Sequence, residues 1–181
     1  MTDTATPQAG ELDHDTSPEP SATSAKEVTL RVASECDEVF LLNLFATTRS
    51  DELAVLAGNP AQAQMFITMQ YRAQKQSYEA VYPAAENKII LLHDEPVGRI
   101  LVDRSSAEFH LVDIAILPQH RNSGLGGNLL RDLLGEATQA AKPVKLLVVS
   151  YNPARRLYER LGFYPIGNDG LYVEMLWSNP A

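Results

Sequence analysis

Three glycines within four residues, Gly124, Gly126 and Gly127, interrupt the segment 117–130 (LPQHRNSGLGGNLL). A strand pattern precedes them and an amphipathic helix pattern follows, so they lie at the start of a helix. The first N–H groups of a helix have no partner within it, and the helix dipole makes that end electropositive. Glycine lets the backbone approach a bulky anion because no Cβ stands in the way. With Arg121 adding charge, the segment predicts a site for a pyrophosphate or polyphosphate.

Two other phosphate-binding loops are excluded by the residues that follow. A dinucleotide-binding fingerprint needs a third glycine where this chain has Leu129. A P-loop needs Lys and then Ser or Thr after its last glycine, and here Gly127 is followed by Asn128. The alternative to an anion site is a helix start whose glycines serve only close packing.

Alternating and helical apolar patterns predict the remaining elements. Strands are expected at 28–32, 87–93, 97–103, 107–116, 144–149, 163–166 and 171–177, and helices at 35–48, 61–80, after the glycines, and at 153–161. The order is therefore β-α-α-β-β-β-α-β-α-β-β. Strands cluster in the middle of the chain and helices flank them, which predicts a mixed α/β or α+β sheet layered by helices.

The acidic charge of the chain is concentrated at its N-terminus. Residues 1–25 hold five of the 23 acidic residues and none of the 15 basic ones. Residues 26–181 therefore hold 18 acids and 15 bases, so their formal charge is −3, whereas that of the whole chain is −8. We expect residues 1–25 to be a disordered acidic leader, or else a docking tail, and residues 26–181 to form one domain. No basic stripe is visible, so nucleic acid is not an expected partner.

Cysteine content and hydropathy exclude several other classes. The single cysteine, Cys36, cannot form an internal disulfide and has no partner at a zinc-binding spacing, so we expect no metal site. No apolar run of membrane-spanning length is present, and the N-terminus lacks the basic and apolar regions of a secretory signal. We therefore expect a cytoplasmic protein with no membrane partner.

A second pattern follows the apolar strand 144–149, in residues 151–163 (YNPARRLYERLGF). Together with the Arg-x-x-Gly-x-Gly pattern of 121–126, it resembles the GNAT acetyltransferase superfamily. In that family an Arg/Gln-x-x-Gly-x-Gly/Ala loop binds the pyrophosphate of coenzyme A, and a later Asn…Ala-x-x-Leu-Tyr-x-x-x-Gly-Phe segment lies beside the pantetheine and the thiol. The matching residues are Asn152, Ala154, Leu157, Tyr158, Gly162 and Phe163. The spacing from Asn152 to Tyr158 is one residue shorter than in many members.

The resemblance covers residues 27–177 and implies a mostly antiparallel central sheet flanked by helices. It also implies acetyl-CoA as the co-substrate and an amine as the acceptor, with direct attack through a tetrahedral intermediate. By resemblance, the backbone of strand 107–116 pairs with the pantetheine where this strand and strand 144–149 splay apart, and an N–H near Ile116 stabilises the oxyanion. The residues that the resemblance implies for coenzyme binding are Ile114, Ala115, Ile116, Arg121, Asn122, Ser123, Gly124, Leu125, Gly126, Gly127 and Asn152.

Tyr158 is the predicted general acid for the leaving thiolate, since a phenol can share its proton with a thiolate. The alternative is a tyrosine that only packs. For the base, the resemblance points to the strand position of His110, and Glu108 shares its face because strand faces alternate by two. The same alternation predicts that Asp113 points the other way. A partly exposed strand histidine, with a water chain serving as the base, is the alternative.

In relatives the acceptor pocket is built by the two helices expected at 35–48 and 61–80. The second carries polar and aromatic residues that fit either a pocket or a solvated face: Gln70, Arg72, Gln76, Tyr78 and, just after it, Tyr82. They do not select among peptide, polyamine, antibiotic or small-metabolite amines. A non-catalytic acyl-CoA sensor, an interaction subunit that uses the acidic tail, an acyl group larger than acetyl and a homodimer all remain open.

Overall fold

The computed structural model describes residues 28–105 and 107–179, and the leader predicted at residues 1–25 lies outside this part of the chain. Seven strands form one sheet in the order β1-β2-β3-β4-β5-β7-β6. Their bounds are β1 Val28–Val32, β2 Glu86–Leu92, β3 Glu95–Asp103, β4 Phe109–Ile116, β5 Val144–Val149, β6 Tyr164–Asn168 and β7 Tyr172–Trp177. Only β4 and β5 run parallel, and all other neighbours are antiparallel. This confirms the predicted mixed, mostly antiparallel sheet.

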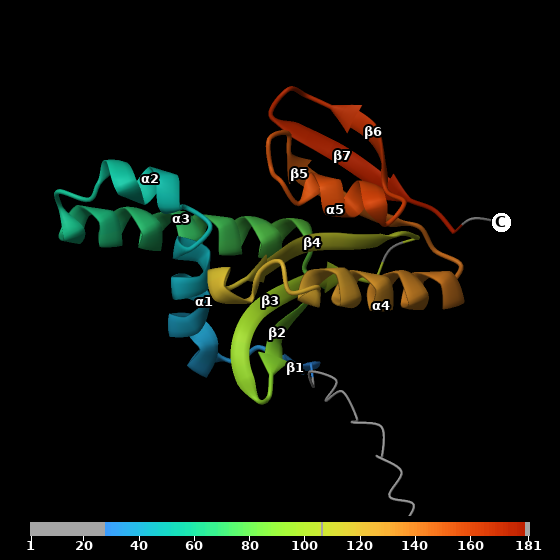
Figure 1. Cartoon of the computed structure of the whole chain (residues 1–181), viewed down its shortest axis with the longest axis horizontal. Coiled ribbons are helices and arrows are strands. Elements are labelled where there is room, and N and C mark those ends of the chain that lie inside the picture. The colour runs from blue at the N-terminus through green and yellow to red at the C-terminus, as the bar shows by residue number, and fades with distance from the viewer. Residues whose placement is uncertain (1–27, 106, 180–181) are drawn as a thin grey trace, which may run out of the picture.

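Helices cover both faces of the sheet (Figure 1). Their bounds are α1 Glu38–Ala46, α2 Ser50–Val55, α3 Pro60–Val81, α4 Leu125–Gln139 and α5 Arg155–Arg160, with short 3-10 turns at Glu35–Asp37 and Pro118–His120. The larger core packs α4 and α5 against β3, β4, β5 and β7. A smaller core packs α1 and α3 against β2 through Leu41, Phe45, Ile67, Tyr71 and Ile89. The sheet thus separates an α4/α5 side from an α1/α3 side.

The helix predicted at 35–48 is shorter than expected and is followed by an unpredicted one. It begins as a 3-10 turn, in which Ser34 donates from its backbone N–H (2.8 Å) and its hydroxyl (2.9 Å) to Asp37 Oδ2. The additional helix, α2, buries none of its residues. A helix without a buried apolar stripe leaves no periodic pattern in the sequence, so α2 could not be found there.

The hairpin between β2 and β3 turns earlier than predicted. The sequence pattern put the turn at Asp94–Pro96, but His93 and Asp94 are the residues with positive φ, 51° and 65°, and β3 already begins at Glu95. Two such residues in succession give a tight two-residue turn whose twist matches that of the strands. Pro96 is accommodated opposite Leu91, where the register of the pair shifts.

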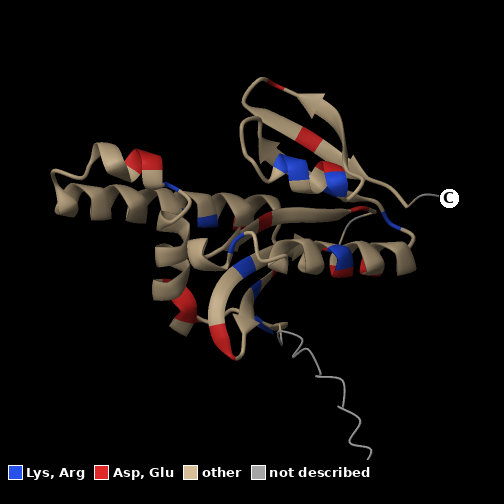
Figure 2. Ribbon diagram, in the orientation of Figure 1, with Lys and Arg blue, Asp and Glu red and all other residues tan. Residues whose placement is uncertain are grey.

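Charged side chains are dispersed over the elements (Figure 2). Blue and red segments alternate along the visible face without one continuous stripe of either sign. Across residues 28–105 and 107–179, no helix is both long and apolar enough to cross a bilayer.

Candidate active site

The hydrogen-bonded ladder between β4 and β5 is short. It joins Phe109–Leu111 to Val144–Leu146 and then ends, although β4 continues to Ile116 and β5 to Val149. The rest of β4 stays paired with β3 on its other side. The edge of β4 that faces β5 is therefore without a strand partner beyond the ladder.

Backbone groups of Ile114 and Ile116 point toward this unpaired edge. The N–H of Leu117 donates to Val97 O of β3 at 2.9 Å. Successive peptide groups along a strand point in opposite directions, so the groups of Ile116 and Ile114 face away from β3. An extended ligand that carries amides can pair with them as an added strand would. The family resemblance implies the pantetheine at this edge.

The N-terminus of α4 carries no protein cap. Gly124 is the N-cap residue in a left-handed conformation (φ 86°), no side chain caps the helix, and Asn122 is also left-handed (φ 58°). None of the backbone N–H groups from Asn122 to Gly127 donates a hydrogen bond to another described residue. Six N–H groups gathered at one helix start can bind a multiply charged anion.

The glycines of this segment serve two purposes. A Cβ at Gly124 would meet nothing within 4 Å, so its left-handed φ is what requires glycine there. A Cβ at Gly126 would lie 3.3 Å from Ile116 Cδ1, and one at Gly127 would lie 3.7 Å from Leu157 Cδ1. These two glycines bring α4 close to β4 and α5. The sequence left anion binding and close packing as alternatives for these glycines. Gly124 fits the first role, and Gly126 and Gly127 fit the second.

Arg121 ties the loop to its neighbours. Its Nε donates to Ile116 O at 2.8 Å, and Nη2 donates to Thr47 Oγ1 at 3.1 Å. The guanidinium thus links the end of β4 to the residue that follows α1. The other polar residues predicted for the coenzyme make local contacts: Ser123 Oγ donates to His120 O (2.8 Å), and Asn152 Oδ1 accepts from Ala154 N–H (2.9 Å). Their contacts with a coenzyme stay predictions.

Tyr158 lies on α5 with only 7% of its surface exposed. Its ring meets Phe163 edge to face at 5.8 Å between centroids. Its hydroxyl forms no hydrogen bond within residues 28–105 and 107–179. Burial, and secondarily the negative charge of Asp113, raises the pKa of this phenol well above its usual range. The side chain is a neutral phenol with an uncommitted hydroxyl.

The two residues predicted as the base lie together. His110 Nε2 is 3.3 Å from Glu108 Oε1, and the His110 ring lies 5.4 Å from that of Tyr82. Lys145, which was not singled out in the sequence, forms ion pairs with both acids of this region. Its Nζ lies 2.9 Å from Glu108 Oε1 and 3.4 Å from Glu174 Oε1. This cluster belongs to the paired part of β4 and β5, since His110 is aligned with Lys145 in the ladder.

The prediction that Asp113 points away from the base residues was wrong. Leu101 pairs with Asp113 but its neighbour Val102 pairs with Leu111, so Val112 is an extra residue in β4. Such a bulge resets the alternation of the strand, and the residues after it change faces. Asp113 therefore lies on the α1/α3 face of the sheet, the same face as the predicted base residues.

Arg99 is the partner of Asp113, and it too was missed in the sequence. Its Nε donates to Asp113 Oδ2 at 3.1 Å, and its Nη2 contacts the same oxygen. Arg99 is buried in β3, and its guanidinium lies 6.0 Å from the ring centroid of Tyr78. A lone arginine inside the apolar run VGRILV was the available clue, because buried charges are normally paired.

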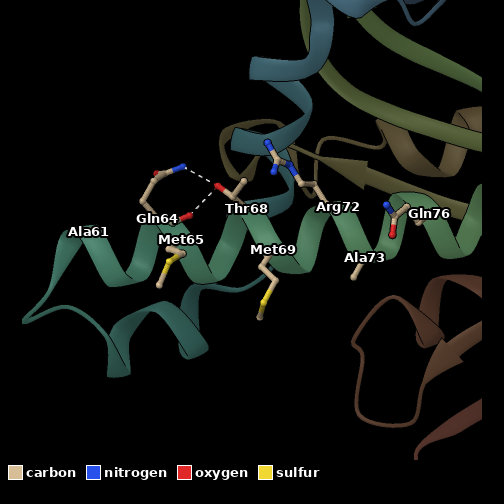
Figure 3. A pocket seen from close by; sticks show the side chains of 8 residues that line it. All are labelled: Ala61, Gln64, Met65, Thr68, Met69, Arg72, Ala73 and Gln76. Atoms are coloured by element: carbon tan, nitrogen blue, oxygen red, sulfur yellow. Dashed lines mark hydrogen bonds between the residues drawn. The ribbon is translucent and has the colours of Figure 1, made fainter.

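The predicted acceptor helix, α3, presents two different faces. Tyr78 faces the sheet, since its ring centroid lies 6.0 Å from the guanidinium of Arg99 on β3, and burial raises the pKa of this tyrosine to about 12. Arg72 and Gln76 instead line an open groove on the outer side of α3 with Met65 and Met69 (Figure 3). In Figure 3 the side chains of Met65 and Met69 extend from one side of α3 and that of Arg72 from the opposite side. The polar and aromatic residues that the sequence singled out on this helix therefore do not line one common pocket.

Comparisons with known proteins agree with this arrangement. Residues 54–174 match the family described as the Acetyltransferase (GNAT) domain. The structure is similar to PaiA N-acetyltransferase from Thermoplasma acidophilum, solved in complex with coenzyme A, with a TM-score of 0.63 and 16% identity over 84% of this chain and 99% of that chain. PH1933 from Pyrococcus horikoshii OT3 gives a TM-score of 0.62 and 18% identity over 86% and 100%. An acetyltransferase from Thermus thermophilus gives 0.59 and 18% over 85% and 97%.

At these identities the structural likeness concerns the fold. No curated protein sequence matches the chain significantly. The family match, however, spans more than half of the 181 residues and includes both the glycine loop and the segment around Tyr158. The chain therefore belongs to the GNAT acetyltransferase family.

Proposed function

We propose that this protein transfers an acetyl group from acetyl-CoA to a primary amine. The observation that carries the proposal is the meeting of an uncapped helix N-terminus and an unpaired strand edge at one residue, Ile116. Its side chain would touch a Cβ at Gly126, and its carbonyl accepts from Arg121. A polyanion joined to an amide-bearing arm, as in coenzyme A, has matching partners on both sides of Ile116.

The chain's own groups fit the parts of acetyl-CoA. The N–H groups of residues 122–127 would hold the pyrophosphate, and the unpaired N–H and carbonyl of Ile114 would hold the pantetheine amides. Bound there, acetyl-CoA would supply the acetyl group as an activated thioester. PaiA, which shares the fold, is an N-acetyltransferase solved with coenzyme A, and this supports the assignment.

Tyr158 is our candidate for the general acid. A tyrosine phenol is protonated at neutral pH, and burial raises its pKa further, so Tyr158 holds a proton that it can donate to the sulfur atom of the leaving thiol. His110, held by Glu108, would accept a proton from the amine. The transfer would run through water, because His110 lies in the paired part of the ladder and not at the unpaired edge of β4. An N–H at Ile116 would stabilise negative charge on the acetyl oxygen, an effect typically worth ~2.7–4 kcal/mol.

The test is a thermal melt with and without acetyl-CoA. Saturation at about 100 times Kd should stabilise the wild type by ~2.7 kcal/mol, a shift in Tm of roughly 5–11 °C for a chain of this size. Gly124→Asp should abolish the shift, because Asp strains the left-handed position and brings a negative charge to the anion site. Gly135→Asp, in open space along α4, is the matched control and should keep the shift. No shift in the wild type would exclude the coenzyme site.

A non-catalytic acyl-CoA sensor is the second candidate. It is favoured by β5 (VKLLVV), which offers no carboxylate, and by the distance of the His110 cluster from the unpaired edge of β4. A sensor and an enzyme both bind acetyl-CoA, so release of free thiol in the presence of a panel of primary amines separates them. Thiol release that depends on the amine supports the transferase, and binding without any release supports the sensor.

A further inference from the structure

Asp113 occupies a distinctive place in the sheet. Beyond the ladder, β4 continues as VDIAI and β5 as LVV, and Asp113 is the one charged residue in either stretch. The bulge at Val112 turns it to the α1/α3 face, where the sequence alternation alone would have buried it against α4. Bulges next to active sites commonly re-aim one side chain in this way.

Only one oxygen of the Asp113 carboxylate is engaged. Arg99 reaches Oδ2 with both Nε and Nη2, whereas Oδ1 accepts no hydrogen bond from any residue the structure describes. The side chain of Arg99 is 9% exposed to solvent, whereas the side chain of Asp113 is 26% exposed. A carboxylate has acceptor sites on both oxygens, so the ion pair leaves Oδ1 able to bind a donor from outside.

Arg99, which holds this carboxylate, has its guanidinium 6.0 Å from the ring centroid of Tyr78 on α3. After burial, the charge of Asp113 contributes to the raised pKa of Tyr78 and of Tyr158 on α5. Neither hydroxyl has a hydrogen-bond partner among the described residues. Asp113 therefore lies beside Arg99 and its Tyr78 neighbour, on the stretch of β4 that continues beyond the ladder with β5.

The other charges nearby are committed elsewhere. Glu108 and Glu174 both contact Lys145. Arg49, whose charge also reaches Tyr78, pairs with Glu52 at 3.5 Å and lies 5.2 Å from the Phe45 ring. Among the described residues, Asp113 is thus the carboxylate that lies on the parted stretches themselves, and it is not next to Lys145.

We infer that Asp113 forms the subsite that binds the ammonium group of the acceptor, with Oδ1 as the acceptor of its N–H hydrogen bonds and Arg99 holding the carboxylate in place. The inference rests on the proposed function and specifies its substrate: a primary amine that arrives as a cation. An ammonium carries a positive charge that attracts the carboxylate, in addition to its donor N–H groups, whereas a neutral hydroxyl offers only one donor, so an ammonium is preferred there.

The test compares benzylamine, a cation at neutral pH, with benzyl alcohol, a neutral molecule of similar shape. Binding of each to the full chain saturated with coenzyme A is measured by calorimetry. We expect the wild type to bind benzylamine about tenfold more tightly or better, and Asp113→Asn to lose this preference. Glu174→Gln, which alters a carboxylate on β7 outside the subsite, is the control and should keep it. Equal binding of both molecules by the wild type, or a preference that survives Asp113→Asn, overturns the inference.

Asp113→Asn leaves Arg99 buried without its counter-charge, and this can prevent folding. The double variant Asp113→Asn/Arg99→Gln removes both charges, and it should bind coenzyme A without distinguishing the two molecules. The wild type offers a measurement that needs no variant: the carboxyl-carbon resonance of Asp113 should move with benzylamine and not with benzyl alcohol. A resonance that ignores benzylamine overturns the inference.

The subsite and the proposed function can fail separately. Benzylamine that binds preferentially but is not acetylated when acetyl-CoA is supplied supports the subsite and contradicts the transferase. Benzylamine that is acetylated equally well by the wild type and Asp113→Asn supports the transferase and overturns the subsite.

Discussion

Arg121 donates from Nε to the carbonyl oxygen of Ile116 at 2.8 Å, and this hydrogen bond joins the glycine loop 122–127 to the open edge of β4. Arg121 also reaches Thr47, so one side chain fixes the relative positions of three segments. The loop and the strand edge can act on one ligand only while they stay aligned.

Arg121→Ala should therefore weaken acetyl-CoA binding and lower Tm together. Loss of a charged hydrogen bond typically costs about 1.5–3 kcal/mol, so we expect Kd to rise by about tenfold or more. Calorimetry and thermal melts provide the two readouts. Arg160→Ala is the matched control, because Arg160 is exposed at the end of α5 and makes no ion pair within the described ranges. Unchanged affinity in Arg121→Ala would contradict this role.

Tyr158→Phe should reduce turnover by about 10²–10⁴-fold with little change in acetyl-CoA affinity. The substitution removes the hydroxyl and keeps the ring that packs against Phe163, so the fold should be preserved. Steady-state thiol release measures turnover and calorimetry measures affinity. Tyr164→Phe, at an exposed tyrosine on β6, serves as the control. Full activity in Tyr158→Phe would leave packing as the only role of this tyrosine.

Asp37 should make the free energy of unfolding depend on pH on the acid side. Hydrogen bonds from Arg31 (2.8 and 2.6 Å) and from the backbone N–H of Ser34 hold the pKa of this buried carboxyl far below its ordinary value. A lowered folded-state pKa contributes stability that is fully present above the unfolded-state pKa, about 3.9, and is lost as the pH falls below it.

Asp37→Asn should accordingly lower the free energy of unfolding at neutral pH by about 1–3 kcal/mol. The difference from the wild type should shrink as the pH falls through about 4. Urea unfolding at a series of pH values measures it. Asp51→Asn, an exposed acid in α2, should show no such pH-dependent difference. A gap between wild type and Asp37→Asn that is constant down to low pH would contradict the assignment.

Gly98→Ala should destabilise the fold and disturb the site at the same time. A Cβ at this position would lie 2.5 Å from the backbone oxygen of Ala115, which cannot move without shifting β4. Overpacking of this kind typically costs about 1–3 kcal/mol. We expect a lower Tm and weaker acetyl-CoA binding, whereas Gly135→Ala in α4 should be neutral or stabilising. If the Tm of Gly98→Ala equals that of the wild type, the prediction is contradicted, because β4 would then be able to move away from β3 without cost.

Local sequence patterns determined most of the fold and the family. Apolar runs, some alternating and some continuous, predicted every strand of the sheet, and the glycine segment with the later pattern around Tyr158 identified the family. These features depend on neighbours along the chain: the period of a strand, the start of a helix, a backbone position that only glycine adopts easily. Such requirements are written in a few consecutive residues, so a single sequence discloses them.

The orientation of Asp113 was decided only by tertiary structure. Strand alternation predicted that Asp113 and His110 lie on opposite faces. The extra residue Val112 placed them on the same face, and nothing about a valine at that position indicates a bulge in the sequence. Arg99, the partner of Asp113, lies on the neighbouring strand, with its guanidinium 6.0 Å from the ring of Tyr78 on α3. A bulge forms where the pairing of two strands and the packing of both faces favour it, so its energy depends on residues far apart in the chain. The sequence by itself therefore determined the strands, most of the helices and the glycine loop, while only the folded sheet decided that Asp113 shares a face with His110.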